Sequence, residues 1–393
     1  MSEYPISKVH TFTSVQRLIF GIGAINNIGE CVKSLGGKKV LIITDRIITK
    51  IGLINNVIKP LEKAFIPYEV WDYVEPEPSF DVAENSVEKI REGDFDLVIG
   101  VGGGSSLDTA KATATFKNAD GKVRDYIKKI IPKRDVPLIL IPTTAGTGSE
   151  VSNVAVFGLL DEDFKYALFS PSLYPDMALI DPMMTVTMPP NVTANTGLDA
   201  LSHAIEAYIS LESSPITDIF AIEAIKLAGR YLREAYANGD NIEARYGMAK
   251  ASLFAGLAFG NAGTTLGHAI GYAHAHIHHS PHGKCVAVTL PYVLEYNAIA
   301  NMERLTHIAK LLGECVDELP LRDSAFRAAI AFKKLLDDLD MPSNLKALGV
   351  KREDIPNLAE RVFKSPKHVA RNPRKVTKED MIKLFEKAYE GIL

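Results

Sequence analysis

The first half of the chain alternates short apolar, β-branched runs with amphipathic segments. The runs predicted as strands are Val40–Asp45, Tyr68–Val74, Asp96–Gly102, Pro137–Thr144, Ala155–Leu159, Ala167–Ser170 and Met177–Ile180. Helical spacing of apolar residues follows several of them, as in Val82–Arg91 and Ser105–Phe116. The run 96–102 is almost entirely apolar, which is typical of a strand buried on both faces. This alternation predicts βαβ units and a parallel sheet with helices on both faces.

The pattern changes after Pro189 and Pro190, where strand-like runs stop. The segments with helical spacing beyond this point are Leu198–Leu211, Thr217–Ala237, Ile242–Gly256, Ala298–Leu312, Ser324–Leu339 and Lys378–Ile392. We therefore expect an α/β domain with a parallel sheet over residues 1–188, followed by an all-α domain over residues 189–393.

Composition excludes several classes of protein. Of 393 residues, 47% are hydrophobic and 23% are charged, and the formal net charge of −4 argues against a nucleic-acid partner. No apolar run approaches the length of about 18 residues that a transmembrane helix needs, so we expect no membrane partner. Cys31, Cys285 and Cys315 are odd in number and far apart, which favours free thiols and a cytoplasmic location.

Glycines follow the apolar run 96–102 directly, where a strand gives way to a helix. The residues of this turn are Gly102, Gly103, Gly104, Ser105 and Ser106. Glycines let the backbone approach a ligand closely, and the start of a helix offers free N–H groups, so the turn suits a phosphate or pyrophosphate. The alternative is a tight strand-to-helix turn with Ser105 as the N-cap, and the local sequence leaves both open.

Two other predicted strands also end in polar residues. Asp45 closes the first strand, where a carboxylate can bind a ribose and repel a 2′-phosphate, which favours NAD over NADP. Its alternative role is that of a helix N-cap or a solvated turn residue. The segment 143–150 (TTAGTGSE) follows the fourth strand and is rich in hydroxyls and glycines. Three strand ends thus carry residues suited to one polar ligand.

Histidine is concentrated in one stretch of the second half. Six of the ten histidines lie within fifteen residues, namely His268, His274, His276, His278, His279 and His282. Upstream, Asp199 and His203 lie four residues apart on a predicted helix and can share a face. Carboxylate and imidazole together suit Fe²⁺, Zn²⁺, Co²⁺ or Ni²⁺. A surface pair at Asp199 and His203, and a polar loop over 274–279, remain alternatives; His10, His307 and His368 receive no role.

Several separated motifs together resemble those of the iron-containing, or group III, alcohol dehydrogenases. The motifs are GGGSSLDTAK at 102–111, PTTAGTGSE at 142–150, GLDALSHAIE at 197–206 and the spacing from His268 to the Pro281-His282-Gly283 segment. The resemblance extends from Phe20-Gly21 to Asn372-Pro373-Arg374 and so covers most of the chain.

This resemblance implies an N-terminal dinucleotide-binding domain and a C-terminal helical metal-binding domain. It implies that Fe²⁺, with Zn²⁺ as the alternative, is held by Asp199, His203, His268 and His282. It implies NAD(H), with NADP(H) as the alternative, bound by Asp45, Gly102, Gly103, Gly104, Ser105, Ser106, Thr143, Thr144, Thr147, Asn153 and Lys165. The implied reaction interconverts small primary alcohols or diols and aldehydes by hydride transfer, in a homodimer or higher homo-oligomer.

The chain departs from the family pattern at Tyr272. Many relatives carry a further histidine four residues after the third metal ligand, and this position is Tyr272 here. We expect Tyr272 to be the catalytic residue that donates or relays a proton, with His274 or His278 as alternative sources of that function. Two other readings stay open: a glycerol dehydrogenase-like or dehydroquinate synthase-like enzyme of the same fold, and a histidine-rich metal-storage or sensing protein.

Overall fold

The chain folds into two units, each with its own core. The computed structural model describes residue 4 and residues 8–159, 164–278 and 281–393. The first unit, Ser14–Met188, is called the sheet unit below. The second contains Pro189–Leu393 together with the described residues before Ser14, and is called the helical unit.

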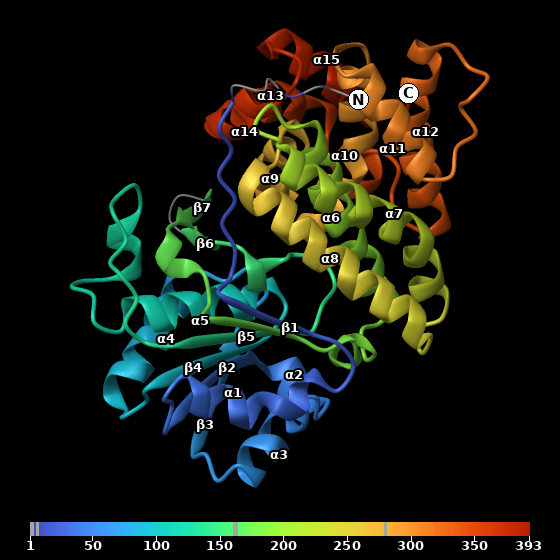
Figure 1. The fold of residues 1–393 in the computed structure, drawn as a ribbon. Coiled ribbons are helices and arrows are strands. Elements are labelled where there is room, and N and C mark those ends of the chain that lie inside the picture. The colour runs from blue at the N-terminus through green and yellow to red at the C-terminus, as the bar shows by residue number, and fades with distance from the viewer. Residues whose placement is uncertain (1–3, 5–7, 160–163, 279–280) are drawn as a thin grey trace. The chain divides into compact units, whose positions relative to one another are not determined.

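A six-stranded parallel sheet forms the centre of the sheet unit, in the order β1-β8-β5-β4-β2-β3 (Figure 1). Its strands are β1 (Arg17–Phe20), β2 (Val40–Asp45), β3 (Tyr68–Val74), β4 (Leu97–Gly102), β5 (Leu138–Pro142) and β8 (Met177–Ile180). Ile99 of β4 lies opposite Ile42 on one side and Ile139 on the other. The predicted parallel sheet is confirmed, while the short and half-exposed β1 was not anticipated.

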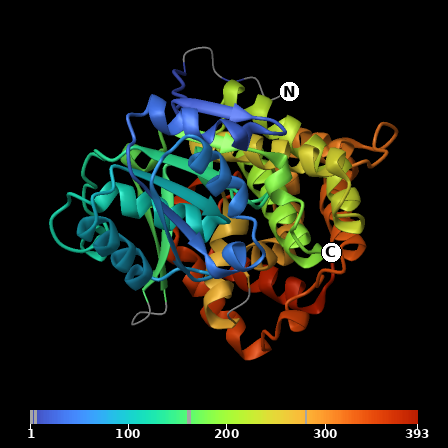
Figure 2. The ribbon, with the colours of Figure 1, turned by 90° about the horizontal axis from the view of Figure 1, so that it is seen from below.

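Helices cover both faces of this sheet. On one face lie α1 (Ile28–Ser34), α2 (Arg46–Lys50) and α3 (Asn55–Lys63), and on the other lie α4 (Phe80–Glu92) and α5 (Gly104–Phe116). Successive strand residues alternate between these layers, so Ile42 packs with α1–α3 and Leu41 with α4 and α5. Figure 2 looks onto the sheet from the side of α1, α2 and α3.

The remaining two strands form a separate antiparallel hairpin. It consists of β6 (Val154–Leu159) and β7 (Phe164–Phe169), so the second strand begins three residues before the predicted Ala167. Phe157 of β6 is fully buried and packs against Phe80 and Phe116 of the two helices on that face. The hairpin therefore extends the helical layer of α4 and α5.

The helical unit contains ten α-helices in its described residues. They are α6 (Pro190–Ile209), α7 (Pro215–Ala237), α8 (Ile242–Ala262), α9 (Leu266–His278), α10 (His282–Asn297), α11 (Met302–Leu311), α12 (Leu321–Asp338), α13 (Ile355–Arg361), α14 (Pro366–Arg371) and α15 (Lys378–Glu390). The predicted helical character of this half is confirmed. No helix in the described parts of the chain is both long and apolar enough to cross a membrane.

Several helix boundaries differ from those predicted. Helix α6 begins at Pro190 rather than Leu198, because proline fits the first turn of a helix, where its missing N–H is not needed. Helices α9 and α10 were not predicted as helices. Leu266, Ala269 and Ile270 of α9 are all fully buried, and α10 is similarly buried along most of its length. A helix buried on all sides lacks the polar stripe that reveals helical periodicity.

Truncating one core isoleucine tests the packing of the sheet unit. Ile42 of β2 is fully buried, so Ile42→Ala should reduce the free energy of unfolding by about 2–5 kcal/mol. Urea unfolding followed by tryptophan fluorescence measures this unit, because the only tryptophan, Trp71, lies on the neighbouring strand β3.

Ile47→Ala is the matched control, since the Ile47 side chain of α2 is 64% exposed. This variant should change the free energy of unfolding by less than about 0.5 kcal/mol. Equal effects of the two substitutions would contradict the assignment of Ile42 to the core.

Candidate metal centre and cofactor site

Three helices of the helical unit carry the predicted metal ligands. Asp199 and His203 lie one turn apart on the long buried helix α6. His268 lies in the first turn of α9, and His282 is the first residue of α10. Residues up to 83 positions apart in sequence are thus brought together by helix packing rather than by a local motif.

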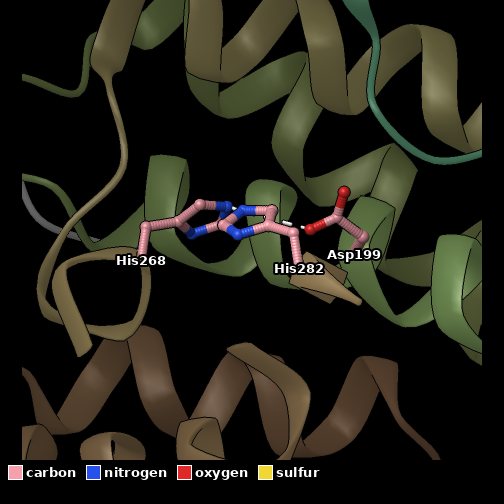
Figure 3. Close-up of side chains that lie close together, drawn as sticks. All are labelled: Asp199, His268 and His282. Carbon is pink, nitrogen blue, oxygen red and sulfur yellow. Dashed lines mark ion pairs between the residues drawn. The ribbon is translucent and has the colours of Figure 1, made fainter. Parts of the chain in front are cut away.

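The side chains of Asp199, His268 and His282 point toward one another (Figure 3). Each offers one ligand atom, and these atoms all lie within 4.8 Å of one another. The ring of His203 lies beside this group, stacked on that of His268 at 4.5 Å between centroids and 25° between planes. The structure therefore brings three of the four predicted ligands into one group and places the fourth in contact with it.

The chemistry of this group fits a divalent cation. Oδ1 of Asp199 and Nε2 of His268 are buried, lie 3.9 Å apart, and have no hydrogen-bond partner among the described residues. This separation is too long for a hydrogen bond but suits two ligands of one ion, which binds nitrogen and oxygen at about 2.0–2.2 Å. Burial raises the pKa of Asp199 to about 7, and a bound cation would favour its charged form.

Glu206 holds His268 from the side away from Asp199. This fully buried carboxylate is bonded to Nδ1 of His268 and accepts hydrogen bonds from the backbone N–H (3.0 Å) and hydroxyl (2.8 Å) of Thr265. Burial alone would raise the pKa of Glu206, but His268 and the hydrogen bonds lower it overall. A proton kept on Nδ1 leaves Nε2 as the atom that can bind a metal.

Glu206 was not predicted as a functional residue, although the sequence contains a signal for it. It lies seven residues after Asp199 and three after His203, which places all three on one face of α6. A carboxylate on the ligand-bearing face of a helix is a candidate to orient a histidine ligand.

The predicted catalytic residue Tyr272 lies beside the ligand group. Its ring stacks on that of His282 at 4.9 Å and 21°, and lies 6.3 Å from that of His268. The backbone of residues 274–278 belongs to α9 rather than to the polar loop considered for it. The side chains of His274 and His278, the alternative sources of a proton, lie outside the described residues.

The three polar strand ends of the sheet unit meet at one edge, because β2, β4 and β5 are parallel neighbours. Ser106 donates a hydrogen bond to Oδ2 of Asp45 (3.3 Å), and the backbone N–H of Thr143 donates to the carbonyl of Gly102 (2.9 Å). Strand order reverses between β2 and β4, and ligands of open α/β sheets bind at such switch points.

The glycine turn leaves no room for larger side chains. Gly102 has a φ of 148°, and a Cβ there would lie 2.5 Å from the hydroxyl oxygen of Ser106. A Cβ on Gly104 would lie 2.8 Å from the side chain of Thr147, and one on Gly103 would contact Thr144. Glycine is therefore needed for close packing as well as for backbone conformation.

Two helices begin at this edge of the sheet. Asp45 is the N-cap of α2, where Oδ1 accepts hydrogen bonds from the backbone of Ile47 (2.9 Å) and Ile48 (3.1 Å). The N-cap of α5 is Gly103, so the alternative that made Ser105 the N-cap is wrong. Within the described part of the chain no side chain caps α5, and its first N–H groups remain suited to an anion.

Two predicted cofactor residues lie farther along the chain on the hairpin. Asn153 directly precedes β6, and its carbonyl accepts a hydrogen bond from the backbone of Ser170 (3.2 Å). Lys165 of β7 forms an ion pair with Glu77, which lies between β3 and α4. These contacts fix both residues within the hairpin region and do not by themselves assign them to a ligand.

Lys111 was not predicted as a functional residue, although it ends the first motif. It is fully buried on α5 and donates hydrogen bonds to the carbonyl of Val154 (2.6 Å) and the hydroxyl of Ser152 (3.3 Å). Burial lowers its pKa, while the nearby carboxylates of Asp108 and Glu150 act in the opposite direction. The ammonium thus ties the helix that follows the glycine turn to the segment that follows β5.

Comparisons with known proteins agree with this arrangement. Residues 15–182 match the family model described as iron-containing alcohol dehydrogenase, and residues 193–389 match the one described as Fe-containing alcohol dehydrogenase family, C-terminal. The chain is 39% identical to long-chain-alcohol dehydrogenase 1 of Geobacillus thermodenitrificans over 97% of its own length and 98% of that protein.

Solved structures show the same fold. A 1,3-propanediol oxidoreductase matches with a TM-score of 0.94 and 36% identity, covering 97% of this chain and 100% of that one. Sulfoacetaldehyde reductase from Bifidobacterium kashiwanohense, solved in complex with NAD⁺, matches with a TM-score of 0.89 and 30% identity, covering 97% and 99%. The chain therefore belongs to the iron-containing alcohol dehydrogenase family, which is a family of oxidoreductases.

Proposed function

We propose that this chain is a metal-dependent, NAD-linked dehydrogenase that interconverts small primary alcohols or diols and their aldehydes. One observation carries the proposal. Asp199, His268 and His282 converge in the interior of the helical unit, and two of their ligand atoms are buried without a hydrogen-bond partner among the described residues. The solved structure named as a 1,3-propanediol oxidoreductase supports the substrate class.

The proposed roles follow from the chemistry of each residue. Asp199, His203, His268 and His282 hold the ion, and Glu206 keeps His268 in the tautomer that binds it. When bound, the ion supplies Lewis-acid polarisation of the alcohol or aldehyde oxygen, and the nicotinamide accepts or supplies the hydride. Tyr272, in ring contact with His282, is the residue proposed to donate or relay the proton.

The sheet unit is proposed to bind the dinucleotide. The first turn of α5 provides N–H groups for the pyrophosphate, and Asp45 provides a carboxylate for the ribose. We propose NAD(H) over NADP(H), because a carboxylate at this place repels a 2′-phosphate. We likewise propose that residues 1–188 serve as the cofactor domain and residues 189–393 as the metal domain.

Family membership supports a proposal for the metal and for the assembly. We propose Fe²⁺ as the ion, with Zn²⁺ as the alternative, since both accept one carboxylate with several imidazoles. We also propose a cytoplasmic homodimer or higher homo-oligomer; the odd number and wide separation of the three cysteines support the location. A metal-storage protein and a dehydroquinate synthase-like lyase are disfavoured, because the relatives quoted above are named as dehydrogenases, oxidoreductases or reductases.

Removal and return of the metal tests this function. Chelation of anaerobically purified protein should abolish NADH oxidation with short aldehydes, because the ligand group then lacks its Lewis acid. One equivalent of Fe²⁺ or Zn²⁺ should restore it, and the rates with each metal rank the two ions.

The matched variants for this experiment are His268→Ala and His307→Ala. The first should lose turnover and metal retention but keep NADH binding; the second alters a half-buried histidine that contacts Tyr208 and should behave as wild type. Turnover that survives complete metal removal, or no turnover with both metal and NADH bound, would overturn the proposal.

Glu206→Gln tests the orienting role of this carboxylate. The amide keeps the shape but removes the charge that favours a proton on Nδ1 of His268, so metal affinity should fall by about 10- to 100-fold. Competition with a chelator measures the affinity directly. An unchanged affinity would show that Glu206 supports only the packing of α6 and α9.

Asp45→Asn tests the cofactor preference. Asparagine is as good an N-cap as aspartate, so α2 should stay intact while the negative charge is lost. The ratio of kcat/KM for NAD⁺ to that for NADP⁺ should fall by about 10-fold, through weaker repulsion of the 2′-phosphate.

Asp125→Asn is the control for this substitution. Asp125 accepts a hydrogen bond from the backbone of Lys122 (2.8 Å) at another turn of the same unit, so its charge should not affect cofactor choice. A preference for NAD⁺ that persists in Asp45→Asn would remove Asp45 from the proposed ribose contact.

A further inference from the structure

The three helices that carry the proposed metal ligands meet one another over glycines. Gly283 lies at the contact of α10 with α6, Gly271 at the contact of α9 with α10, and Gly267 of α9 beside both α6 and α10. Gly267 directly precedes His268, and Gly283 directly follows His282. Each pair of these helices is therefore in contact through a residue that has no side chain.

Backbone conformation does not explain these glycines. None of the three has a φ in the left-handed range that favours glycine. Within a helix, glycine is less favourable than alanine, because it loses more conformational freedom when the chain folds. The remaining explanation is the space that a Cβ would need, so the packing around each position decides its role.

Gly283 lies against the backbone of the neighbouring helix. A Cβ there would lie 2.5 Å from the carbonyl oxygen of Asn195 and 3.0 Å from Cβ of Asp199. Asn195 lies one turn before Asp199 on α6, so the start of α10 rests directly on the turn that carries a ligand. A carbon atom in ordinary contact needs about 3.5 Å, so a side chain here would move α10 away from α6 by roughly 1 Å.

The other two glycines lie against side chains. A Cβ on Gly271 would lie 2.5 Å from Cγ2 of Val286, a fully buried residue of α10. A Cβ on Gly267 would lie 3.0 Å from Oε1 of Glu206, the carboxylate that holds His268. The first glycine thus permits the close approach of α9 to α10, and the second that of α9 to α6.

The spacing of the ligand atoms depends on this close approach. Two ligands that bind one ion at about 2.0–2.2 Å can lie at most about 4.4 Å apart. The ligand atoms of Asp199, His268 and His282 lie within 4.8 Å of one another, which is near this limit (Figure 3). An outward shift of α10 would therefore take His282 out of reach of an ion held by the other two residues.

We propose that Gly267, Gly271 and Gly283 are positioning residues of the metal site: the helix contacts that they permit set the distances between the ligands, and thereby the affinity for the ion. The inference rests on the proposed function in one respect, because it assumes that the ligand group holds a divalent cation. It requires neither a particular alcohol nor a particular dinucleotide.

Gly283→Ala tests the inference on the full, metal-free chain. Competition with a chelator measures the Kd of Zn²⁺, a probe that does not oxidise, and circular dichroism measures the urea midpoint of the metal-free protein. Displacement of His282 should raise the Kd by about 10- to 100-fold, the range typical of residues that orient a metal ligand.

Gly229→Ala is the matched control. A Cβ on Gly229 of α7 would lie 2.9 Å from the backbone carbonyl oxygen of Leu311 on α11, and neither helix carries a ligand. This variant should lower the urea midpoint, because it also crowds a backbone atom, but it should leave the Kd of Zn²⁺ unchanged. A purely structural role of Gly283 would give this same pattern in Gly283→Ala.

A second pair of variants decides the question if Gly283→Ala does not fold. Gly271→Ala should weaken Zn²⁺ binding, because its Cβ separates α9 from α10. Adding Val286→Ala removes the Cγ2 atom that this Cβ meets, so the double variant should recover the lost affinity.

Three results would overturn the inference: a wild-type Kd in Gly283→Ala, an equal loss of affinity in Gly229→Ala, or no recovery in the double variant. If the wild type binds neither Zn²⁺ nor Fe²⁺, the proposed function fails together with the inference. If the wild type binds the ion and the variants with alanine at 271 and 283 bind it equally well, the inference alone fails.

Discussion

A carboxylate can be buried only where hydrogen bonds or positive charge compensate it, and the helical unit depends on this constraint. Glu206 and Asp199 lie on one face of α6, 0% and 5% exposed. Glu206 is compensated by Thr265 and His268 from within the protein. Oδ1 of Asp199 has no such partner among the described residues. The packing of α6, α9 and α10 therefore creates a deficit of positive charge at one point, which the proposed divalent cation would fill.

In the sheet unit, the main constraint is the packing of the residues that follow the strand ends. Parallel strands place their carboxyl ends at one edge, and the residues that follow β2, β4 and β5 must pack there without filling the space. Glycine at 102–104 meets this requirement, and hydroxyl groups of Ser106, Thr144 and Thr147 lie against it. The buried ammonium of Lys111 donates hydrogen bonds to Ser152 and Val154 and so fixes the segment before β6. Contacts within the chain thus hold the edge in place, as the proposed nucleotide site requires.

The sequence predicted the parts of this molecule that depend on local periodicity. Strands β2 and β3 begin and end as predicted, because their residues alternate or are uniformly apolar between clear turn signals. Helices α9 and α10 escaped prediction, since helices buried all round carry no polar stripe. Their histidines were found through spacing and family resemblance, whereas the contact of His282 with Asp199 and His268 required the packing of three helices.

Contacts between residues far apart in sequence also limited how much of the site could be predicted. Glu206 lay within a motif that was recognised, yet its bond to His268 joins residues 62 positions apart. His368 stood alone in the sequence, and only the packing of α14 against α9 shows its contact with Tyr272. In the sequence, Lys111 resembles any other helical lysine, and only the structure shows that it is fully buried. Residues that act through burial or through a neighbour on another helix cannot be recognised from the periodicity of the sequence.

All the proposed metal ligands come from the helical unit, and this has a thermodynamic consequence. A ligand that binds only the folded state adds its binding free energy to the stability of the part that folds around it. The ion would therefore stabilise α6, α9 and α10 and leave the sheet unit unaffected, while the dinucleotide would act on the sheet unit. Each unit would then be stabilised by a different ligand. A shortage of iron in the cell would lower the resistance of the helical unit to proteolysis.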